Sequence, residues 1–545
     1  MLDSLPPGTA TPTDTVTSKV FVNGTVLSNE ISLAQVTVSK SFNKIAWAKL
    51  VFLDGSASDR NFPLSNDDKF KPGNTIKVQL GYQGQADTVF EGIIIKHAIK
   101  VRRDGPSLLM IEAKDKAIKL SAPRRSAYYI DQKDKDVIST LATGFDPEVD
   151  ATTVEHKQLV QFDASNWDFI VTRAEANGML VLTDDGKLLV KKPVTTGAAV
   201  LTATYGQNIW EFEAEMDARR QFKNVKSLSW DFTQQVTEES SPGNAVYTEN
   251  GNLSSDQLGE VLSAEVVLNH TGHLNTDQLQ SWADAYAMHN HLCKAAGRVR
   301  IEGKAAVKPG HMITLAGVGD RFNGNVFVTG VLHHFEGYWH TDIQFGWREE
   351  WFYKKEDVMD KPASGLLPGI NGLQIGVVKD VDDTGKDGQY RVKVHVPSIS
   401  SGNVGIWARV ATLDAGAERG VYFRPQTGDE VVLGFLNDDP REAIILGYLH
   451  SKSNKQSPLP EDPNALQYGF VTKEKLKLVF DDTNKRMTLR VPSGSGEQKI
   501  VLNSDGGALE ISDDHQNSIK MDASGISIKA GSGNITIKGT MVKIN

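Results

Sequence analysis

The chain ends in the stretch "MDASGISIKAGSGNITIKGTMVKIN", residues 521–545. Short runs in which isoleucine alternates with polar residues are separated by Gly, Ser and Asn, a pattern typical of short β-strands with one apolar side. The alternation continues to the last residue without a charged or proline-rich tail, and an unprotected β-edge of this kind readily pairs with other chains. The stretch therefore predicts a β-structure that something else must cover.

The same pattern repeats upstream of this stretch. Apolar pairs two residues apart occur at Ile500/Leu502, Leu509/Ile511, Ile519/Met521, Ile526/Ile528, Ile535/Ile537 and Val542/Ile544. The first members of successive pairs are 9, 10, 7, 9 and 7 residues apart. Repeats this small cannot bury an apolar face alone and must stack. We expect these side chains to form the interior of a needle.

A period of about eight residues supplies one side of a triangular prism. Residues 469–545 are therefore predicted to form a triple-stranded β-helix from three copies of the chain, with backbone hydrogen bonds between chains and the apolar side chains on the axis. The alternative is a flat β-meander packed against another domain, which would leave its final edge open.

Composition limits the remaining possibilities. The 545 residues suggest several domains, and a net charge of −9 without a basic stripe argues against nucleic-acid binding. The only cysteine, Cys293, cannot form an intrachain disulfide and is interpreted as buried packing. Because the N-terminus lacks the basic and apolar regions of a signal peptide, we expect synthesis in the cytoplasm.

The predicted fold class is mainly β, with two barrel-like modules that carry helical insertions and a small OB-type Greek-key barrel ahead of the trimeric needle. In the mixed section, Asp163 or Ser165 is expected to cap a helix and Asp185-Gly186 to turn a hairpin. The polar stretch 233–257 is expected to be mobile. The predicted divisions are a flexible arm (1–18), a first barrel (19–120), a mixed α/β insertion (121–222), a second barrel (223–352), a linker (353–369), the OB-type barrel (370–450), a linker (451–468) and the needle (469–545).

The most enzyme-like cluster is "HHFEGYWH", which contains His333, His334, Glu336 and His340. Adjacent residues of a strand point to opposite faces, so only one of His333 and His334 can join His340 across the turn. Two ligands make a poor zinc site. The cluster is therefore interpreted as cross-strand pairing.

Other candidates for chemistry are equally weak. The loop "DDTGKDGQ" (382–389) lacks the glutamate that a calcium loop requires, and the pairs Asp438/Asp439 and Asp513/Asp514 are typical of turns. The aromatic residues of the small barrel occupy apolar runs and are expected to be core rather than a stacking surface: Trp407, Tyr422, Phe423 and Phe435. We predict no catalytic residue, no cofactor and no metal.

Four stretches together resemble one family of proteins. They are "FDASNWDFIVTRAEANGMLVLTDDGKLLV", "VKPGHMITLAGVGDRFNGNVFVTGVLHHFEGYWHTDIQFG", the pair "GQYRVKVHVP" and "RPQTGDEVVLGFLNDDPREAIILGYLH", and the repeats of the tail. In this order they are similar to VgrG-type spike and hub proteins of contractile injection systems, which include type VI secretion systems, phage tails and the antifeeding-prophage and Photorhabdus-virulence-cassette particles. Some relatives carry a lysozyme domain between barrel and needle or a C-terminal effector extension, and we expect neither in this chain.

The resemblance implies a homotrimer without enzymatic activity. Its hub would adapt a sixfold inner tube to a threefold needle that punctures a target envelope, and inner-tube, hub-adaptor and baseplate proteins would be its partners. A PAAR-type cap would dock on the tip residues Met541, Val542, Lys543, Ile544 and Asn545. The resemblance also implies assembly into a baseplate, with ejection or an extracellular location on firing and transient contact with the target membrane. The alternatives are a cell-wall hydrolase and a carbohydrate-binding module built on the OB-type barrel.

Overall fold

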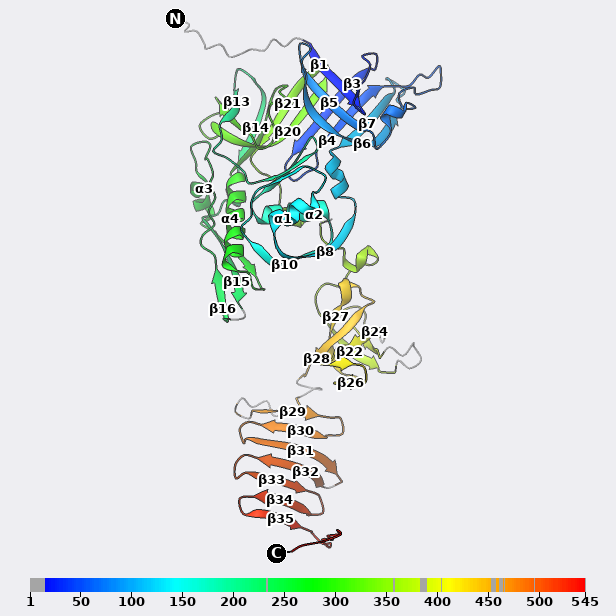
Figure 1. The fold of residues 1–545 in the computed structure, drawn as a ribbon, viewed down its shortest axis with the longest axis vertical. Helices are drawn as coiled ribbons and strands as arrows, with labels where there is room; N and C mark the ends of the chain where they lie inside the picture. Colours follow the sequence, from blue (N-terminus) through cyan, green and yellow to red (C-terminus); the bar gives the residue numbers. More distant parts are fainter. Residues whose placement is uncertain are drawn as a thin grey trace. The chain divides into compact units, whose positions relative to one another are not determined.

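The computed structural model describes residues 15–231, 234–355, 358–382, 390–402, 404–451, 457–459, 464, 466–494 and 496–544 (Figure 1). The chain divides into two compact units, Met1–Asp360 and Lys361–Asn545. None of the helices in the described residues is long and apolar enough to cross a membrane. The chain is mainly β, as the sequence predicts.

The first module of the first unit is built from seven strands whose alternating side chains fill one core. Val36, Leu50, Phe90 and Ile111 are almost completely buried in it, because every second residue of a strand points to the same face. The strands are β1 (Val16–Val22), β2 (Thr25–Val26), β3 (Leu33–Ser41), β4 (Trp47–Leu53), β5 (Thr75–Tyr82), β6 (Asp87–Lys100) and β7 (Leu108–Lys114).

The second module shares one continuous sheet with the first. Strand β20 pairs antiparallel with β3, with Val331 opposite Lys40, and thereby joins both modules into a sheet of 13 strands. Strands β13 and β14 lie in the range predicted as the mixed insertion, residues 121–222. They belong to the second module because they pair with β19 and β18, which are far downstream in the chain. Its strands are β13 (Ala199–Thr204), β14 (Ile209–Met216), β18 (Ala295–Glu302), β19 (Met312–Ala316), β20 (Gly324–Glu336) and β21 (Tyr338–Phe345).

A smaller α/β layer follows the first module. Ser165 caps α2 by accepting a hydrogen bond from the backbone nitrogen of Asp168, and Asp185-Gly186 turns the hairpin of β11 and β12 with both residues at positive φ, as predicted. The elements are β8 (Arg124–Lys133), α1 (Asp134–Leu141), β9 (Pro147–Val149), β10 (Glu155–Ser165), α2 (Asn166–Ala176), β11 (Leu180–Asp184) and β12 (Lys187–Lys191).

A second α/β layer contains residues 234–257 of the polar stretch for which mobility is predicted, and these include the strand Val236–Glu239 and the start of the helix Ser255–Leu262. The ammonium group of Lys294 is fully buried and donates to the Glu249 carboxylate and to the backbone oxygens of Asn250 and Leu253, which ties this part of the stretch to Lys294. The polar composition gives no sign of this contact, because the partner lies some 40 residues away. The elements are β15 (Asn224–Asp231), β16 (Val236–Glu239), α3 (Ser255–Leu262), β17 (Glu265–His270) and α4 (Thr276–Leu292).

The second unit begins with a closed barrel of five strands around Val378, Val394, Val431 and Ile445. Its strands are β22 (Gln374–Asp380), β23 (Val392–His395), β24 (Ile406–Val410), β27 (Glu430–Phe435) and β28 (Ala443–Tyr448). The calcium-like loop discussed above lies, except for Asp382, outside the described residues. Short 3-10 turns occur at Asp68–Phe70, Lys116–Leu120, Ala218–Arg220, Phe352–Lys354, Pro362–Gly365 and Leu436–Asp438.

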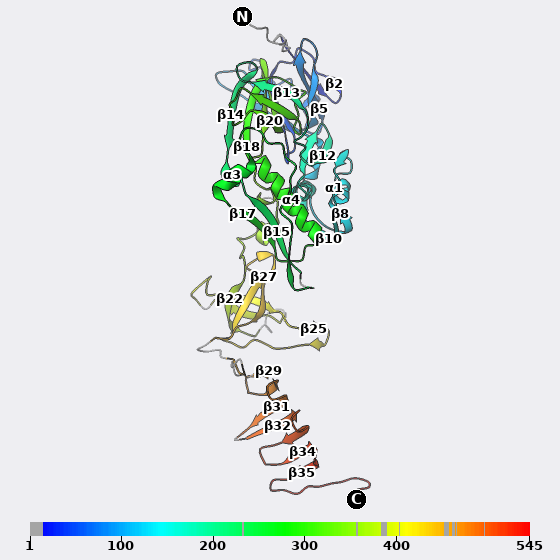
Figure 2. The same cartoon turned by 90° about the vertical axis from the view of Figure 1, so that its left-hand side faces the viewer.

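An arm between β24 and β27 carries the short strands β25 (Ala415–Gly416) and β26 (Arg419–Gly420) away from the barrel (Figure 2). The prediction that Tyr422 and Phe423 are core residues was wrong, since their side chains are 72% and 55% exposed. They lie on the returning side of this arm, where no barrel core is available. Phe435 packs against the barrel core, as predicted.

The unit ends in a sheet of seven strands that run back and forth like the rungs of a ladder (Figure 1). Each strand after the first pairs antiparallel with the strand before it, so the hydrogen bonds of these strands lie within one chain. The sequence had predicted hydrogen bonds between chains. Short turns make pairing within one chain possible, because they return the chain directly alongside itself. The strands are β29 (Gln467–Val471), β30 (Lys477–Asp481), β31 (Arg486–Ser493), β32 (Gly496–Asn503), β33 (Ala508–Ser512), β34 (Ser518–Asp522) and β35 (Gly525–Lys529).

Candidate functional site

One face of the seven-stranded sheet is lined by two continuous rows of apolar side chains, which we call the apolar face. Within a strand the two apolar residues are two positions apart, and each lies opposite an apolar residue of the next strand, as Ile500 does with Ile511. The first row consists of Phe470, Leu478, Leu489, Ile500, Ile511, Ile519 and Ile528. The second row consists of Tyr468, Phe480, Met487, Leu502, Leu509, Met521 and Ile526.

The opposite face of the same sheet is polar. Arg490 forms an ion pair with Glu497 across β31 and β32, and Lys520 lies 2.9 Å from the Asp522 carboxylate on β34. The hydrogen bond from Arg490 holds the pKa of the Glu497 carboxyl below its usual value. This separation assigns one face to water and the other to a partner.

In a single chain the apolar face is open to water. The side chains of Leu502, Ile528 and Ile526 are 44%, 53% and 69% exposed. A hollow of about 570 Å³ runs along Leu489, Ile500, Ile511, Ile519, Ile528 and Ile535. Covering a side chain of this size stabilises a protein by roughly 1.5–3 kcal/mol, and an apolar patch this continuous marks an interaction surface.

Eight of the predicted needle-interior residues lie together on this face: Ile500, Leu502, Leu509, Ile511, Ile519, Met521, Ile526 and Ile528. Sequence reasoning missed the six members contributed by β29–β31, although they show the same spacing at 468/470, 478/480 and 487/489. The remaining predicted residues, Ile535, Ile537, Val542 and Ile544, follow β35 and belong to no strand of the described chain. Of the predicted docking residues, Met541 and Ile544 are 73% and 88% exposed, and Asn545 lies outside the described residues.

The histidine hairpin pairs across strands as predicted. His334 and His340 face each other on β20 and β21 with ring centroids 5.0 Å apart. His333 points to the other side, where its Nδ1 lies 2.9 Å from Thr341 Oγ1. Burial lowers the pKa of His333 to about 3, with a smaller effect from Lys40, so the ring is neutral near pH 7.

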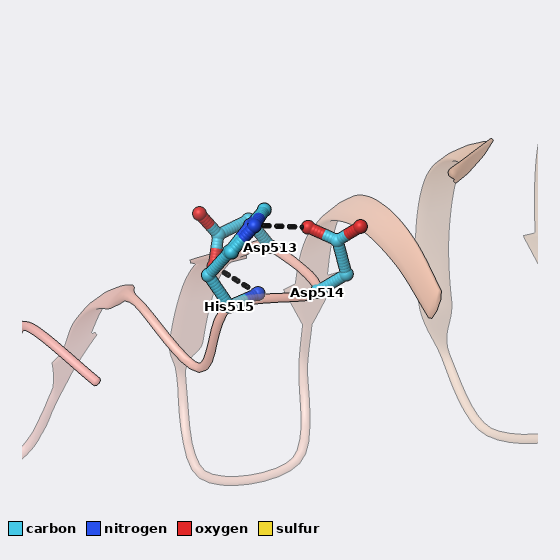
Figure 3. A group of neighbouring side chains, drawn as sticks. All are labelled: Asp513, Asp514 and His515. Atoms are coloured by element: carbon cyan, nitrogen blue, oxygen red, sulfur yellow. Dashed lines mark hydrogen bonds and ion pairs between the residues drawn. The ribbon is translucent and has the colours of Figure 1, made fainter. Parts of the chain in front are cut away.

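A group of three potential ligands occurs in the turn between β33 and β34, where Asp513, Asp514 and His515 place ligand atoms within 4.8 Å of one another (Figure 3). Asp513 already accepts hydrogen bonds from the backbone nitrogens of His515 and Asn517 at 3.0 and 2.9 Å. A hydrogen bond from the Asn517 side chain is the main reason that the pKa of Asp513 lies below its usual value. These bonds are those of a closed turn, and we assign no metal to it.

A buried polar cluster in the first unit was missed by the sequence analysis. The Asp134 carboxylate contacts His156 Nε2 at 2.8 Å, Arg173 Nε at 2.7 Å and Asn177 Nδ2 at 2.9 Å, beside a hollow of about 360 Å³. Burial opposes its ionisation, but these hydrogen bonds outweigh burial and hold the pKa of Asp134 well below its usual value. The carboxylate is fully used in joining α1, α2 and β10, which indicates a structural role.

The chain combines a β-rich first unit, a five-stranded barrel and a sheet with one apolar face, and in its barrel and C-terminal sheet it is similar to VgrG-type spike proteins. Residues 374–450 match the family described as the type VI secretion system/phage-baseplate injector OB domain, and residues 468–545 match the phage baseplate V C-terminal trimerisation domain. Residues 12–337, more than half of the chain, match the Alg8 N-terminal domain, and the chain belongs to that family.

Two relatives from Vibrio cholerae serotype O1 share a short segment with this chain. The type VI secretion system spike protein VgrG3 is 37% identical over 95 residues, which are 16% of this chain and 9% of that protein. The actin cross-linking toxin VgrG1 is 35% identical over 101 residues, which are 17% of this chain and 9% of that protein. The chain thus matches less than a tenth of the length of either relative.

Solved structures that are similar to this chain have lower sequence identity to it. A tail protein from Neisseria meningitidis is 15% identical, with a TM-score of 0.46 and coverage of 62% of this chain and 98% of that one. A prophage tail protein from Shewanella oneidensis is 12% identical, with a TM-score of 0.44 and coverage of 61% and 96%.

Proposed function

We propose that three copies of this chain form the central spike and hub of a contractile injection particle. The observation that carries the proposal is the apolar face, which is continuous over seven strands and uncovered in a single chain. Three such sheets, each forming one side of a triangular prism, would place all their apolar faces on a common axis and leave the charged faces in water. The match of residues 468–545 to a trimerisation domain supports this arrangement.

The first unit would serve as the hub. Its two modules share one sheet, so three chains would present six modules in a ring, which suits the adaptation of a sixfold inner tube to a threefold needle. The barrel would form the neck, and sheath contraction would drive the needle through a target envelope. The work of such a spike is mechanical, and we expect no catalytic activity from it.

The oligomeric state of two matched variants tests the apolar face. Ile519→Asp places a charge in the first row, whereas Ser527→Asp places the same charge on the opposite face, where Ser527 lies next to Lys520. Because a buried unpaired carboxylate is strongly unfavourable, native mass spectrometry of the full chain should show a monomer for Ile519→Asp and a trimer for Ser527→Asp and the wild type. A monomeric wild type, or a trimeric Ile519→Asp protein, would refute the proposal.

The tip is proposed to carry a PAAR-type cap on residues 541–545. Deletion of these five residues should abolish binding of a purified PAAR-type protein in a pull-down and leave the trimer intact, because the strands of the sheet end at Lys529. Equal capture by the full and the shortened trimer would exclude this docking site.

A further inference from the structure

The arm of the barrel ends in contact with the first strand of the C-terminal sheet. The rings of Phe423 on the arm and Phe470 on β29 are stacked, with centroids 5.5 Å apart and planes 12° from parallel. Phe470 lies opposite Leu478 and is therefore the first member of the first row. Phe423 thus continues that row beyond the sheet, although it belongs to the barrel.

Several contacts fix the arm in the position that presents Phe423. The guanidinium of Arg419 lies 2.7 Å from the Asp414 carboxylate, and the backbone nitrogen of Val421 donates to the Asp414 oxygen at 2.9 Å. The hydroxyl of Tyr448 on β28 donates to the backbone oxygen of Phe423 at 3.1 Å. The backbone at Phe423 is therefore held by the barrel wall, while its ring is held by the sheet.

Neither ring is covered adequately within one chain. Phe423 and Phe470 are 55% and 50% exposed despite their stack, whereas buried aromatic rings contribute most of their energy through covered area. Three copies of the sheet, closed as described above, would bring three such ring pairs together at the end of the axis next to the barrels. Water would then be excluded from the end of the core at which the needle begins.

We propose that Phe423 closes the barrel-proximal end of the trimeric needle core and packs each barrel onto the needle, so that the two are coupled mechanically. The inference rests on the proposed trimer and adds a contact that the trimer does not require. A needle joined to its barrels by the chain connection alone would still form a trimer.

A kinetic double-mutant cycle on the full-length trimer tests the contact. The rate of trimer dissociation on heating would be measured for the wild type, Phe423→Ala, Phe470→Ala and the double variant. Because a stacked aromatic pair contributes to stability beyond its buried area, the two single effects should not multiply. The double variant should dissociate about 2- to 12-fold more slowly than the product of the two single effects predicts. Effects that simply multiply would overturn the inference, whereas a wild type that is no trimer would instead refute the proposed function.

Tyr422→Ala provides the matched control, because Tyr422 is the neighbouring aromatic residue and is 72% exposed. Its effect should multiply with that of Phe470→Ala. Proximity is checked independently with Phe423→Cys/Phe470→Cys in a Cys293→Ser background. Mild oxidation should remove both thiols in this variant and neither in Tyr422→Cys/Phe470→Cys, and free thiols at positions 423 and 470 after oxidation would contradict the contact.

Discussion

Two histidines of the first unit are neutral because they are buried. Burial lowers the pKa of His289 to about 4, and the nearby positive charge of Arg220 adds to the effect. Its ring is stacked on Trp351 at a centroid distance of 4.4 Å. His333 behaves in the same way, with a pKa of about 3. Both rings accept a proton readily only after unfolding has exposed them to water.

The first unit should therefore lose stability in acid. The pKa of each histidine is lower in the folded than in the unfolded chain, so the unfolded chain binds protons first as the pH falls. The contribution of neutral His289 to the free energy of unfolding is fully present above pH 6.5. It is lost as the pH falls from 6.5 to about 4, which lowers the free energy of unfolding by about 3 kcal/mol. His289→Phe keeps a ring next to Trp351 but removes the titration. Thermal unfolding followed between pH 7 and 4 should be less pH-dependent in this variant, and an unchanged dependence would contradict the assignment.

The buried ammonium group of Lys294 is predicted to matter more than any exposed ion pair. Lys294→Met removes the donor to two backbone oxygens and to one oxygen of the Glu249 carboxylate, which should reduce the free energy of unfolding of the first unit by about 3 kcal/mol. Lys226→Met is the matched control, since its pair with Glu239 is 37% and 47% exposed, and its effect on stability should be clearly smaller than that of Lys294→Met. Chemical denaturation measures both, and equal losses would contradict the prediction.

At the scale of single elements, local rules placed several features correctly. The cap of α2 and the turn between β11 and β12 were predictable because both depend on residues within a few positions of one another. The apolar face was also predictable, since a strict period of two puts Ile526 and Ile528 on one side whatever covers them. The arm was not, because an apolar run such as the one around Tyr422 looks the same whether it enters a core or leaves it.

The cap of α2 can be tested directly. The hydroxyl of Ser165 accepts from the Asp168 backbone nitrogen at 3.1 Å and donates to the Asp168 carboxylate at 2.5 Å. Ser165→Ala should therefore destabilise the first unit by about 1 kcal/mol. Ser139→Ala removes only an exposed hydroxyl bonded to a carbonyl of its own helix and should change stability by less than about 0.5 kcal/mol. Hydrogen exchange of the α2 amides would show whether the loss begins at that helix.

At the scale of the whole molecule, the sequence could not show how the modules join. Strand β20 pairs with β3 although nearly 300 residues separate them, and Thr37 and His334 are 297 positions apart along the chain. No local pattern encodes such a partner, because each strand alone offers only an apolar face and free backbone groups. The same reason explains why the sequence could not show which strands pair in the C-terminal sheet. A period near eight residues predicts short strands, but the length of the turns decides whether a strand pairs with its neighbour in the same chain or with a strand of another chain.

Removal of the C-terminal sheet should separate assembly from folding. The four buried apolar cores that stabilise the first unit involve no residue beyond Val358, so a chain that ends at Ala465 should keep the thermal unfolding of the first unit. It should lose the trimer, because both rows of the apolar face begin at Tyr468 and Phe470. Analytical ultracentrifugation should show a trimer for the full chain and a monomer for the shortened one. A shortened chain that remained trimeric would place the main contacts between copies in the hub or the barrel, and the apolar face would then need a different partner.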